Sequence, residues 1–303
     1  MSVMDVRFTN SKQSLSGANR SQVDWAQLTT ADRIRWVERE GYVVIPDLLN
    51  SEQLDAIRSE VSNLPTTATD YSEHQRGSKG PWPSCPNTVK VIALPAMVEY
   101  LTALFGDELI CTSCTYSVSE PGHPGIAIHT DSQPYGSKIF GNQSSSPVLV
   151  RVLYYLDDLT PERSPFKVIP YSHLSMHLDG VPYNRFLAHP DETMVTCRAG
   201  TAAVINQKVF HGNYPNYSKE NRRLLAIAYR PAWAGPKGEV PGRDTELIKQ
   251  LPSEVRPFLG DPNTCRIDYD VPNRPDDLQV DAPGISPKRW EYVAPPPTQD
   301  DAR

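Results

Sequence analysis

The hydrophobic pattern of the chain changes once, close to residue 108. Before that point apolar residues recur every three or four positions in three stretches, which is typical of amphipathic helices. From about Glu108 to Trp233, short apolar runs alternate with clusters of Gly, Pro, Asn and Ser. Such spacing indicates short strands joined by turns. The pattern therefore predicts a helical lead-in followed by a mainly β core.

Each of the three helical stretches has a start and a stop signal. Thr29 can cap the first helix with Asp32 in its first turn, and a glycine follows the last turn. The letters YVVIP after this helix predict a short strand. The expected helices run from Thr29 to Gly41, from Asn50 or Ser51 to just before Pro65, and from Pro95 to Gly106.

Eight strands are expected in the β core. Their sequences are LICTSCTYSVS, GIAIHTD, PVLVRVLYYL, FKVIP, TMVTC, TAAVINQ, VFHG and RRLLAIAYR. Eight short strands broken by turn residues predict a double-sheet jelly roll of the kind found in cupins. Metal ligands on these strands would lie inside the mouth of the barrel.

The expected domain organisation is one domain between two irregular ends. Residues 1–25 are polar without a period and are expected to be flexible, and residues 26–235 form the domain, with a lead-in over 26–107 and the core over 108–235. Residues 236–303 contain 12 prolines and one helix signal, near Thr245 to Gln250, so they are expected to pack on the core as an extension. Residues 66–88 show neither period, and either a lid or a plain surface loop would account for them.

Composition and charge limit the kinds of partner that the protein is expected to bind. The net charge is −6 without a basic stripe, which argues against nucleic acid. The sequence shows no apolar run of membrane-span length and no signal-peptide core at its start, so a cytoplasmic location and no membrane partner are expected. Five scattered cysteines are expected to be free thiols in a reducing compartment. The oligomeric state is left open between monomer and homodimer.

The candidate chemistry centres on His129, Asp131 and His211. An imidazole and a carboxylate two positions apart on a strand point to the same side, so both can reach one metal ion. His211 can complete the site if its strand lies antiparallel nearby. Two imidazoles and one carboxylate on one face leave open positions, as in non-heme Fe(II) oxygenases. The alternative is that HxD is an ordinary tripeptide and that His211 is satisfied by a backbone carbonyl near a turn.

Arg222 is the second candidate. Alternation along RRLLAIAYR puts it on one face with Leu224, Ala226 and Ala228, and a guanidinium among small residues suits a pocket that holds a carboxylate bidentately. In the alternative, Arg223 points inward and Arg222 is solvated. Two other pairs are expected to be unrelated to metal: Cys111 and Cys114, three apart on a strand and therefore on opposite faces, and His173 and His177, in a loop after a strand.

The segments LTTADRIRWVEREGYVVIPDLLNSEQLDAIRSEV, HTD, VLYYLDDLTPERSPFKVIPYSH and RAGTAAVINQKVFHGNYPNYSKENRRLLAIAYR together resemble the phytanoyl-CoA dioxygenase family, over about residues 28–232. The resemblance implies a double-stranded β-helix, Fe(II) held by His129, Asp131 and His211, and Arg222 on the distal carboxylate of 2-oxoglutarate, with O2 as the second cosubstrate. Lys90 falls roughly where some members make another cosubstrate contact.

Three positions depart from the family pattern. Phe166 stands where a hydroxyl residue is often placed near the cosubstrate, Tyr171 stands where a glycine is common, and Ile126 stands where fungal natural-product members frequently have Gln. These departures put cosubstrate contacts other than Arg222 in question.

The expected function is therefore a 2-oxoglutarate-dependent dioxygenase that hydroxylates an unactivated C–H bond of a small-molecule metabolite, with natural-product biosynthesis as a candidate setting. The alternatives are desaturation, epoxidation or ring rearrangement with the same oxidant, a cupin-type metal isomerase or hydrolase without oxygen chemistry, and a non-enzymatic binding protein. The expected walls of the substrate site are the 66–88 loop, residues 132–147 and the proline-rich extension.

Overall fold

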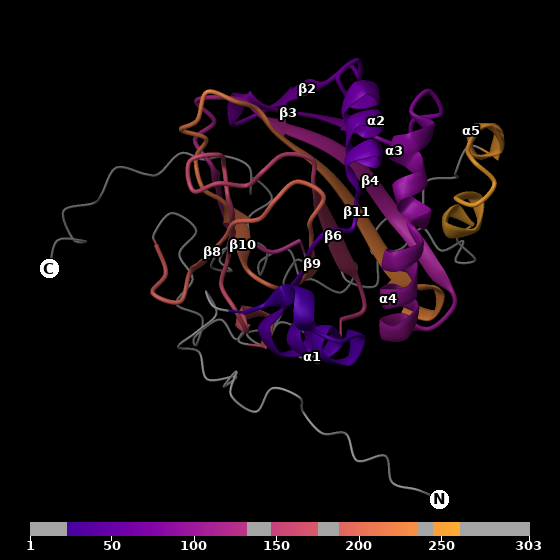
Figure 1. The fold of residues 1–303 in the computed structure, drawn as a ribbon, viewed down its shortest axis with the longest axis horizontal. Coiled ribbons are helices and arrows are strands. Elements are labelled where there is room, and N and C mark those ends of the chain that lie inside the picture. The colour runs from indigo at the N-terminus through magenta and orange to yellow at the C-terminus, as the bar shows by residue number, and fades with distance from the viewer. Residues whose placement is uncertain (1–22, 132–146, 175–187, 235–244, 261–303) are drawn as a thin grey trace, which may run out of the picture.

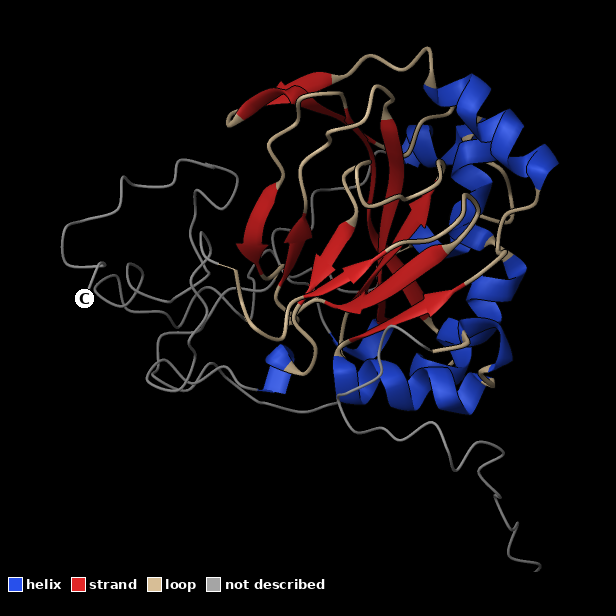
Figure 2. Cartoon of the chain, turned by 60° about the vertical axis from the view of Figure 1, so that its left-hand side comes forward, coloured by secondary structure: helices blue, strands red, loops and turns tan. Residues whose placement is uncertain are grey.

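The chain is arranged in three layers in the computed structural model, which describes residues 23–131, 147–174, 188–234 and 245–260. Helices α2, α3 and α4 cover one face of a large sheet, and a smaller sheet lies on the other face (Figure 1). The same order of layers is visible after rotation (Figure 2). The helices are α1 (Thr30–Glu40), α2 (Ser51–Val61), α3 (Pro86–Lys90), α4 (Pro95–Phe105) and α5 (Thr245–Gln250).

The large sheet is antiparallel and contains seven strands within the described ranges. In spatial order they are β1 (Tyr42–Ile45), β9 (Ala202–Asn206), β6 (Val150–Tyr155), β11 (Arg222–Pro231), β4 (Leu109–Ser119), β3 (Ser72–Lys79) and β2 (Thr67–Thr69). One face packs on the helices through a continuous apolar core that includes Val152, Tyr154 and Leu225. The other face turns toward the small sheet.

The small sheet is also antiparallel and closes the barrel. Among the described residues it contains, in order, β5 (Ile126–His129), β10 (His211–Asn213), β7 (Phe166–Val168) and β8 (Thr193–Val195). A second apolar cluster fills the space between the two sheets, with Leu153 and Leu224 from the large sheet and Phe166 from the small one. The fold is thus the mainly β, cupin-like jelly roll that the strand pattern predicts.

Helix caps, turn residues and the hydrophobic pattern in the sequence predicted most helices and strands correctly. All eight strands expected after Glu108 are present, as are the strand after the first helix, the three long helices and the helix at Thr245–Gln250. The first helix has a complete capping box: Thr29 Oγ1 accepts from Asp32 N at 3.2 Å, and Thr29 N donates to Asp32 Oδ2 at 3.2 Å. Gly41 ends this helix with φ of 82°, a left-handed conformation that glycine adopts without strain.

Removing this cap gives a measurable but small effect. We expect Thr29→Ala to lower the free energy of unfolding by about 1 kcal/mol, because the amide of Asp32 loses its acceptor. For a domain of this size that corresponds to a fall in Tm of about 2–4 °C. Thr30→Ala, at the next exposed position, is the matched control and should leave Tm nearly unchanged. Equal Tm values for the two variants in a thermal melt would contradict the role of the cap.

The prediction of an irregular loop over residues 66–88 is wrong. Strands β2 and β3 form a hairpin there, and β3 pairs with β4 from Gln75↔Ser119 to Lys79↔Thr115. Helix α3 follows within the same segment. The hairpin extends the large sheet, so most of this segment has regular secondary structure in the described fold.

The prediction that Cys111 and Cys114 face opposite sides of their strand is also wrong. A β-bulge lies between them, since Ser113 pairs with Ala228 while Cys111 pairs with Tyr229. The extra residue resets the alternation, and both thiols are buried in the core between the large sheet and the helices. Neither forms a disulfide, nor do Cys85 and Cys197, while Cys265 lies outside the described residues.

The segment Pro86–Phe105 corrects the expectation that no stretch has the length of a membrane span. Its 20 residues are long enough and apolar enough to cross a membrane, by length and composition alone. Half of the segment is buried inside the fold, and it is divided between α3, the 3₁₀ turn Val91–Ala93 and α4. It therefore packs as core helices do, and by itself it is weak evidence for a membrane.

The ends of the chain are described only in part. Of the expected flexible stretch 1–25, residues 1–22 lie outside the described residues. Trp25 packs edge-to-face against Trp36, with the ring centroids 5.1 Å apart. Of the expected extension 236–303, residues 245–260 are described, and Leu251, Val255 and Leu259 join the core beside the helices. Of residues 132–147, expected as a substrate wall, 132–146 lie outside the described residues.

Candidate active site

The pairing of β5 with β10 brings the two candidate histidines together. The strands are antiparallel with His211 opposite His129, and the ring centroids are 4.4 Å apart. Gly212 allows this close approach, because a Cβ atom there would lie 2.4 Å from the carbonyl oxygen of Ile126. The antiparallel neighbour that the sequence argument required for His211 is present.

Both imidazoles are oriented by backbone carbonyls. His129 Nδ1 lies 2.8 Å from Ala127 O, and His211 Nδ1 lies 3.0 Å from Val209 O. A carbonyl only accepts, so Nδ1 carries the hydrogen in each ring and Nε2 is left with its lone pair, as a metal ligand requires. The carbonyl contact that we considered as an alternative for His211 is therefore part of a ligand-like arrangement.

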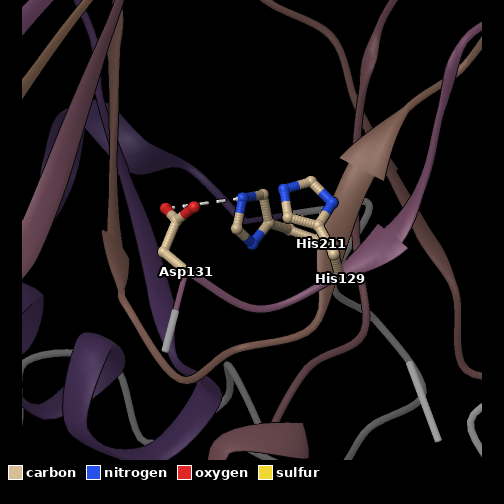
Figure 3. Close-up of side chains that lie close together, drawn as sticks. All are labelled: His129, Asp131 and His211. Carbon is tan, nitrogen blue, oxygen red and sulfur yellow. Dashed lines mark ion pairs between the residues drawn. The ribbon is translucent and has the colours of Figure 1, made fainter. Parts of the chain in front are cut away.

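Asp131 completes the cluster. It follows β5, and its Oδ2 lies 3.8 Å from His211 Nε2 (Figure 3). One ligand atom from each of the three residues lies within 4.8 Å of the others. Among the described residues this is the one group of three or more His, Cys, Asp or Glu side chains close enough to hold a metal ion.

Arg151 was not singled out from the sequence. Its Nε lies 3.2 Å from Asp131 Oδ2, and the Asp131 side chain is 3% exposed. The ion pair holds the carboxylate beside the histidines. A single charged residue within the apolar strand PVLVRVLYYL was the available signal, since period-two alternation places it on one face with Leu153 and Tyr155.

A cavity of about 760 Å³ opens onto this cluster between the two sheets. Its floor is apolar, with Leu153, Phe166 and Leu224, and its polar lining comes from both sheets and from the β2–β3 hairpin. Charged or polar residues in the lining include Asp70, Arg76, Lys79, Arg151, His129, His211 and Arg222. The volume is within the range of cavities that bind small molecules.

Arg222 lies in this cavity at 1% exposure. It shares the cavity face with Leu224 and Ala226, as the alternation predicts. The alternative with Arg223 inward is wrong: Arg223 is on the opposite face and forms a bidentate pair with Asp157, at 2.9 and 2.6 Å. Arg222 Nη2 is 3.4 Å from Ser164 Oγ, while its Nε and Nη1 have no hydrogen-bond partner among the described residues.

Arg222 is buried, and the side chains near it include two tyrosines. Burial lowers the pKa of the guanidinium, and the nearby Tyr155 and Tyr71 side chains oppose this shift. The Tyr71 hydroxyl lies 3.1 Å from His123 Nε2. Burial, with the adjacent positive charge of Arg222, lowers the pKa of His123 to about 3. A neutral imidazole therefore lies beside the arginine at neutral pH.

The other residues discussed from the sequence lie elsewhere or differ in role. Lys90 lies outside the cavity, with its Nζ 3.6 Å from Glu254 Oε1. His173 belongs to the 3₁₀ turn Ser172–Leu174, and its Nε2 lies 2.8 Å from Glu38 O. His177 lies outside the described residues. Tyr171 has a positive φ of 51°. Phe166 and Ile126 both line the cavity.

The donors present fit a divalent metal with a dicarboxylate beside it. Two imidazole nitrogens and one carboxylate converge, which is a donor set suited to iron with positions left for other ligands. In the lining of the same cavity, Nε and Nη1 of the buried Arg222 have no acceptor among the described residues. Leaving these two buried N–H groups unpaired is costly, so a carboxylate that binds there gains a strong, charge-assisted pair.

Comparisons with known proteins agree with this geometry. The model of the phytanoyl-CoA dioxygenase family matches residues 37–224, which is more than half of the chain. In sequence the chain is 25% identical over 139 residues to Dioxygenase trt7 from Aspergillus terreus (strain NIH 2624 / FGSC A1156). That match spans 46% of this chain and 46% of trt7, a little under half the length of each.

Two solved structures share the fold. HygX from Streptomyces hygroscopicus, with nickel, 2-oxoglutarate and hygromycin B bound, superposes with a TM-score of 0.57 at 18% identity over 67% of this chain and 88% of HygX. The epimerase SnoN, in complex with Fe3+, alpha ketoglutarate and nogalamycin RO, superposes with a TM-score of 0.56 at 16% identity over 86% of this chain and 97% of SnoN. At these identities the likeness concerns the fold.

Proposed function

The chain belongs to the phytanoyl-CoA dioxygenase family, and from that premise we propose that it is a dioxygenase that hydroxylates an unactivated C–H bond of a small-molecule metabolite. Iron and 2-oxoglutarate are the cofactor and cosubstrate of this class. The observation that carries the proposal is the convergence of His129, Asp131 and His211 beside a cavity whose lining also includes Arg222. The triad supplies metal ligands, and the arginine supplies an anchor for a carboxylate.

Each of these side chains has a distinct task in the proposed reaction. His129 and His211 ligate through Nε2, which their Nδ1 contacts keep directed at the metal. Arg151 orients the Asp131 carboxylate. Fe(II) held by these residues would supply, with 2-oxoglutarate and O2, the oxidising chemistry for hydroxylation, in which one oxygen atom of O2 enters the product and the other enters succinate as carbon dioxide is lost. Phe166 and Leu153 exclude water from the cavity.

The lining also favours a class of substrate. Once Arg222 is assigned to the cosubstrate and Arg151 to Asp131, Arg76 remains as a positive side chain in the cavity lining, together with the exposed Lys79. Asp70 is the negative side chain of the described lining that is not assigned to the metal. With apolar walls around them, these charges suit a mainly apolar metabolite that carries an anionic group. HygX and SnoN were crystallised with hygromycin B and nogalamycin RO, which are themselves small molecules.

The experiment that tests the proposal is an anaerobic titration of the purified protein with Fe(II) and then 2-oxoglutarate. We expect a metal-to-ligand charge-transfer absorption on addition of 2-oxoglutarate, and succinate formation once O2 is admitted. Screening carboxylate-bearing metabolites for stimulated succinate release, with product analysis by mass spectrometry, then identifies the substrate and the outcome. A protein that binds Fe(II) but shows neither the absorption nor succinate would contradict the proposal.

A further inference from the structure

Gln75 is a buried polar residue in the wall of the active-site cavity. It is 5% exposed, although the other residues of strands β2 and β3 are half-buried or exposed. Gln75 Oε1 accepts a hydrogen bond from the Ser119 hydroxyl, while Nε2 has no hydrogen-bond partner among the described residues. A buried amide with an unpaired donor lowers stability. Its position in the wall of a binding cavity therefore points to a ligand oxygen that accepts from Nε2.

Strand register puts this amide on the cavity face of the large sheet. Gln75 pairs with Ser119 on β4, and Ser119 pairs with Arg222 on β11. Directly opposite residues share one face of a sheet, so the three side chains form a row across it. Gln75 lies two strands from Arg222, which is roughly 10 Å at the usual strand spacing. This spacing favours a contact with the substrate over a second contact with the carboxylate assigned to Arg222.

The wall around Gln75 also carries hydroxyl groups. Thr115 and Ser117 lie on the same face of β4 as Ser119, and both line the cavity. Their hydroxyls have no hydrogen-bond partner among the described residues. The apolar side chains of the lining come from β6, β7 and β11 and are Leu153, Phe166, Leu224 and Ala226. One side of the cavity therefore suits an apolar skeleton, and the other side suits the oxygen atoms that this skeleton carries.

Lys79 adds a positive charge to the same wall. It follows Gln75 by four residues on β3, so about 13 Å separates their Cα atoms. The Lys79 side chain has no ion-pair partner among the described residues, whereas Arg76 donates to Thr66 through Nε and Nη2. Lys79 is exposed and Gln75 is buried. An anionic group would thus lie at the exposed part of this wall, and the oxygen that accepts from Gln75 at its buried part.

We propose that Gln75 is a specificity-determining residue, which donates from Nε2 to a carbonyl oxygen of the substrate while Lys79 binds the anionic group of the same molecule. The substrate class is then an extended, apolar metabolite whose carbonyl oxygen lies on the order of 13 Å from its anionic group. The inference rests on the proposed function, since it assigns two residues to the substrate of that reaction.

The test uses two probes that differ in one carbonyl group. Dehydrolithocholic acid and cholanic acid share a rigid apolar ring system and a carboxylate, and only the first has a ketone at the end remote from the carboxylate. Anaerobic calorimetric titration of the protein loaded with Fe(II) and 2-oxoglutarate measures their Kd values. We expect wild type to bind the keto acid about 10-fold more tightly, because its ketone accepts from Gln75. Gln75→Leu should bind both acids equally.

Two further variants separate the roles. Lys79→Gln should weaken both acids alike, because each has the carboxylate, and should keep the preference for the ketone. Glu73→Leu is the matched control, since Glu73 is on the same strand but has a side chain that is 85% exposed and lies outside the cavity lining. This control should bind both acids as wild type does. The Kd for 2-oxoglutarate, from the charge-transfer absorption, should be the same in Gln75→Leu and wild type.

Several outcomes would overturn the inference while leaving the proposed function intact. These are a wild type that binds both acids equally or binds neither, a ketone preference that persists in Gln75→Leu, and a Kd for 2-oxoglutarate that rises in Gln75→Leu. Wild type that shows no charge-transfer absorption with 2-oxoglutarate would overturn both the inference and the proposed function.

Discussion

Replacement of Asp131 by alanine should abolish turnover and weaken Fe(II) binding by more than about 100-fold. The carboxylate supplies one of three converging donors, and its loss leaves two neutral imidazoles to hold a dication. Altering only the partners of metal ligands already costs about 10–100-fold in affinity, so loss of a ligand costs more. The Arg151 guanidinium, now without its carboxylate at 3.2 Å, adds repulsion beside the vacated position. Anaerobic Fe(II) titration measures the affinity directly.

Asp70→Ala is the matched control for this variant. Asp70 is an exposed carboxylate that lines the same cavity, away from the three ligand residues. The Asp70→Ala variant should bind Fe(II) and develop the charge-transfer absorption with 2-oxoglutarate as wild type does. Fe(II) affinity retained in Asp131→Ala, with the fold intact by circular dichroism, would show that the metal is bound elsewhere.

Replacement of Arg222 by alanine should raise the Kd for 2-oxoglutarate by about 100-fold while leaving Fe(II) affinity close to that of wild type. The guanidinium is 1% exposed, so its pairing with a carboxylate takes place with little water to screen it. Removing one partner of such a buried pair costs about 2–5 kcal/mol, and about 3 kcal/mol corresponds to roughly 100-fold in Kd. The charge-transfer absorption, titrated with 2-oxoglutarate, gives both the Kd and the integrity of the metal site.

Arg223→Gln separates cosubstrate binding from stability. Arg223 is adjacent in sequence but lies on the other face, paired with the buried carboxylate of Asp157. This variant should melt at a lower temperature because Asp157 loses its bidentate partner, yet its 2-oxoglutarate Kd should match that of wild type. If both arginine variants changed the Kd alike, the effect would come from disturbance of β11 rather than from an anchor at Arg222.

The elements with strong local signals were predictable from the sequence, and the misses have physical causes. The capping boxes at Thr29 and Asn50 and the apolar runs of the barrel act within a few residues, so they are visible in the linear pattern. The β2–β3 hairpin has no hydrophobic period because only Gln75 in its strands is buried, while the other residues are half-buried or exposed. Its main-chain pairing with β4 forms it instead.

The bulge in β4 is a second feature that the local sequence pattern could not predict. Alternation along LICTSCTYSVS assigns opposite faces to Cys111 and Cys114, and only the pairing partner reveals the extra residue between them. A bulge changes register without a distinctive residue at this position, so no reading of the strand alone would place both thiols in one core.

By itself the sequence determined the class of the protein: a jelly roll, an HxD pair on a strand, a later histidine and an arginine on a face of small residues. These follow from side-chain alternation and chemistry, which are properties of short segments. Tertiary structure alone decided how distant segments meet. The pairing of β5 with β10 puts His129 opposite His211, and the pairing of β3 with β4 puts Gln75 opposite Ser119. Strand neighbours are chosen by the packing of the whole barrel, so the residues that complete the site appear only once it is folded.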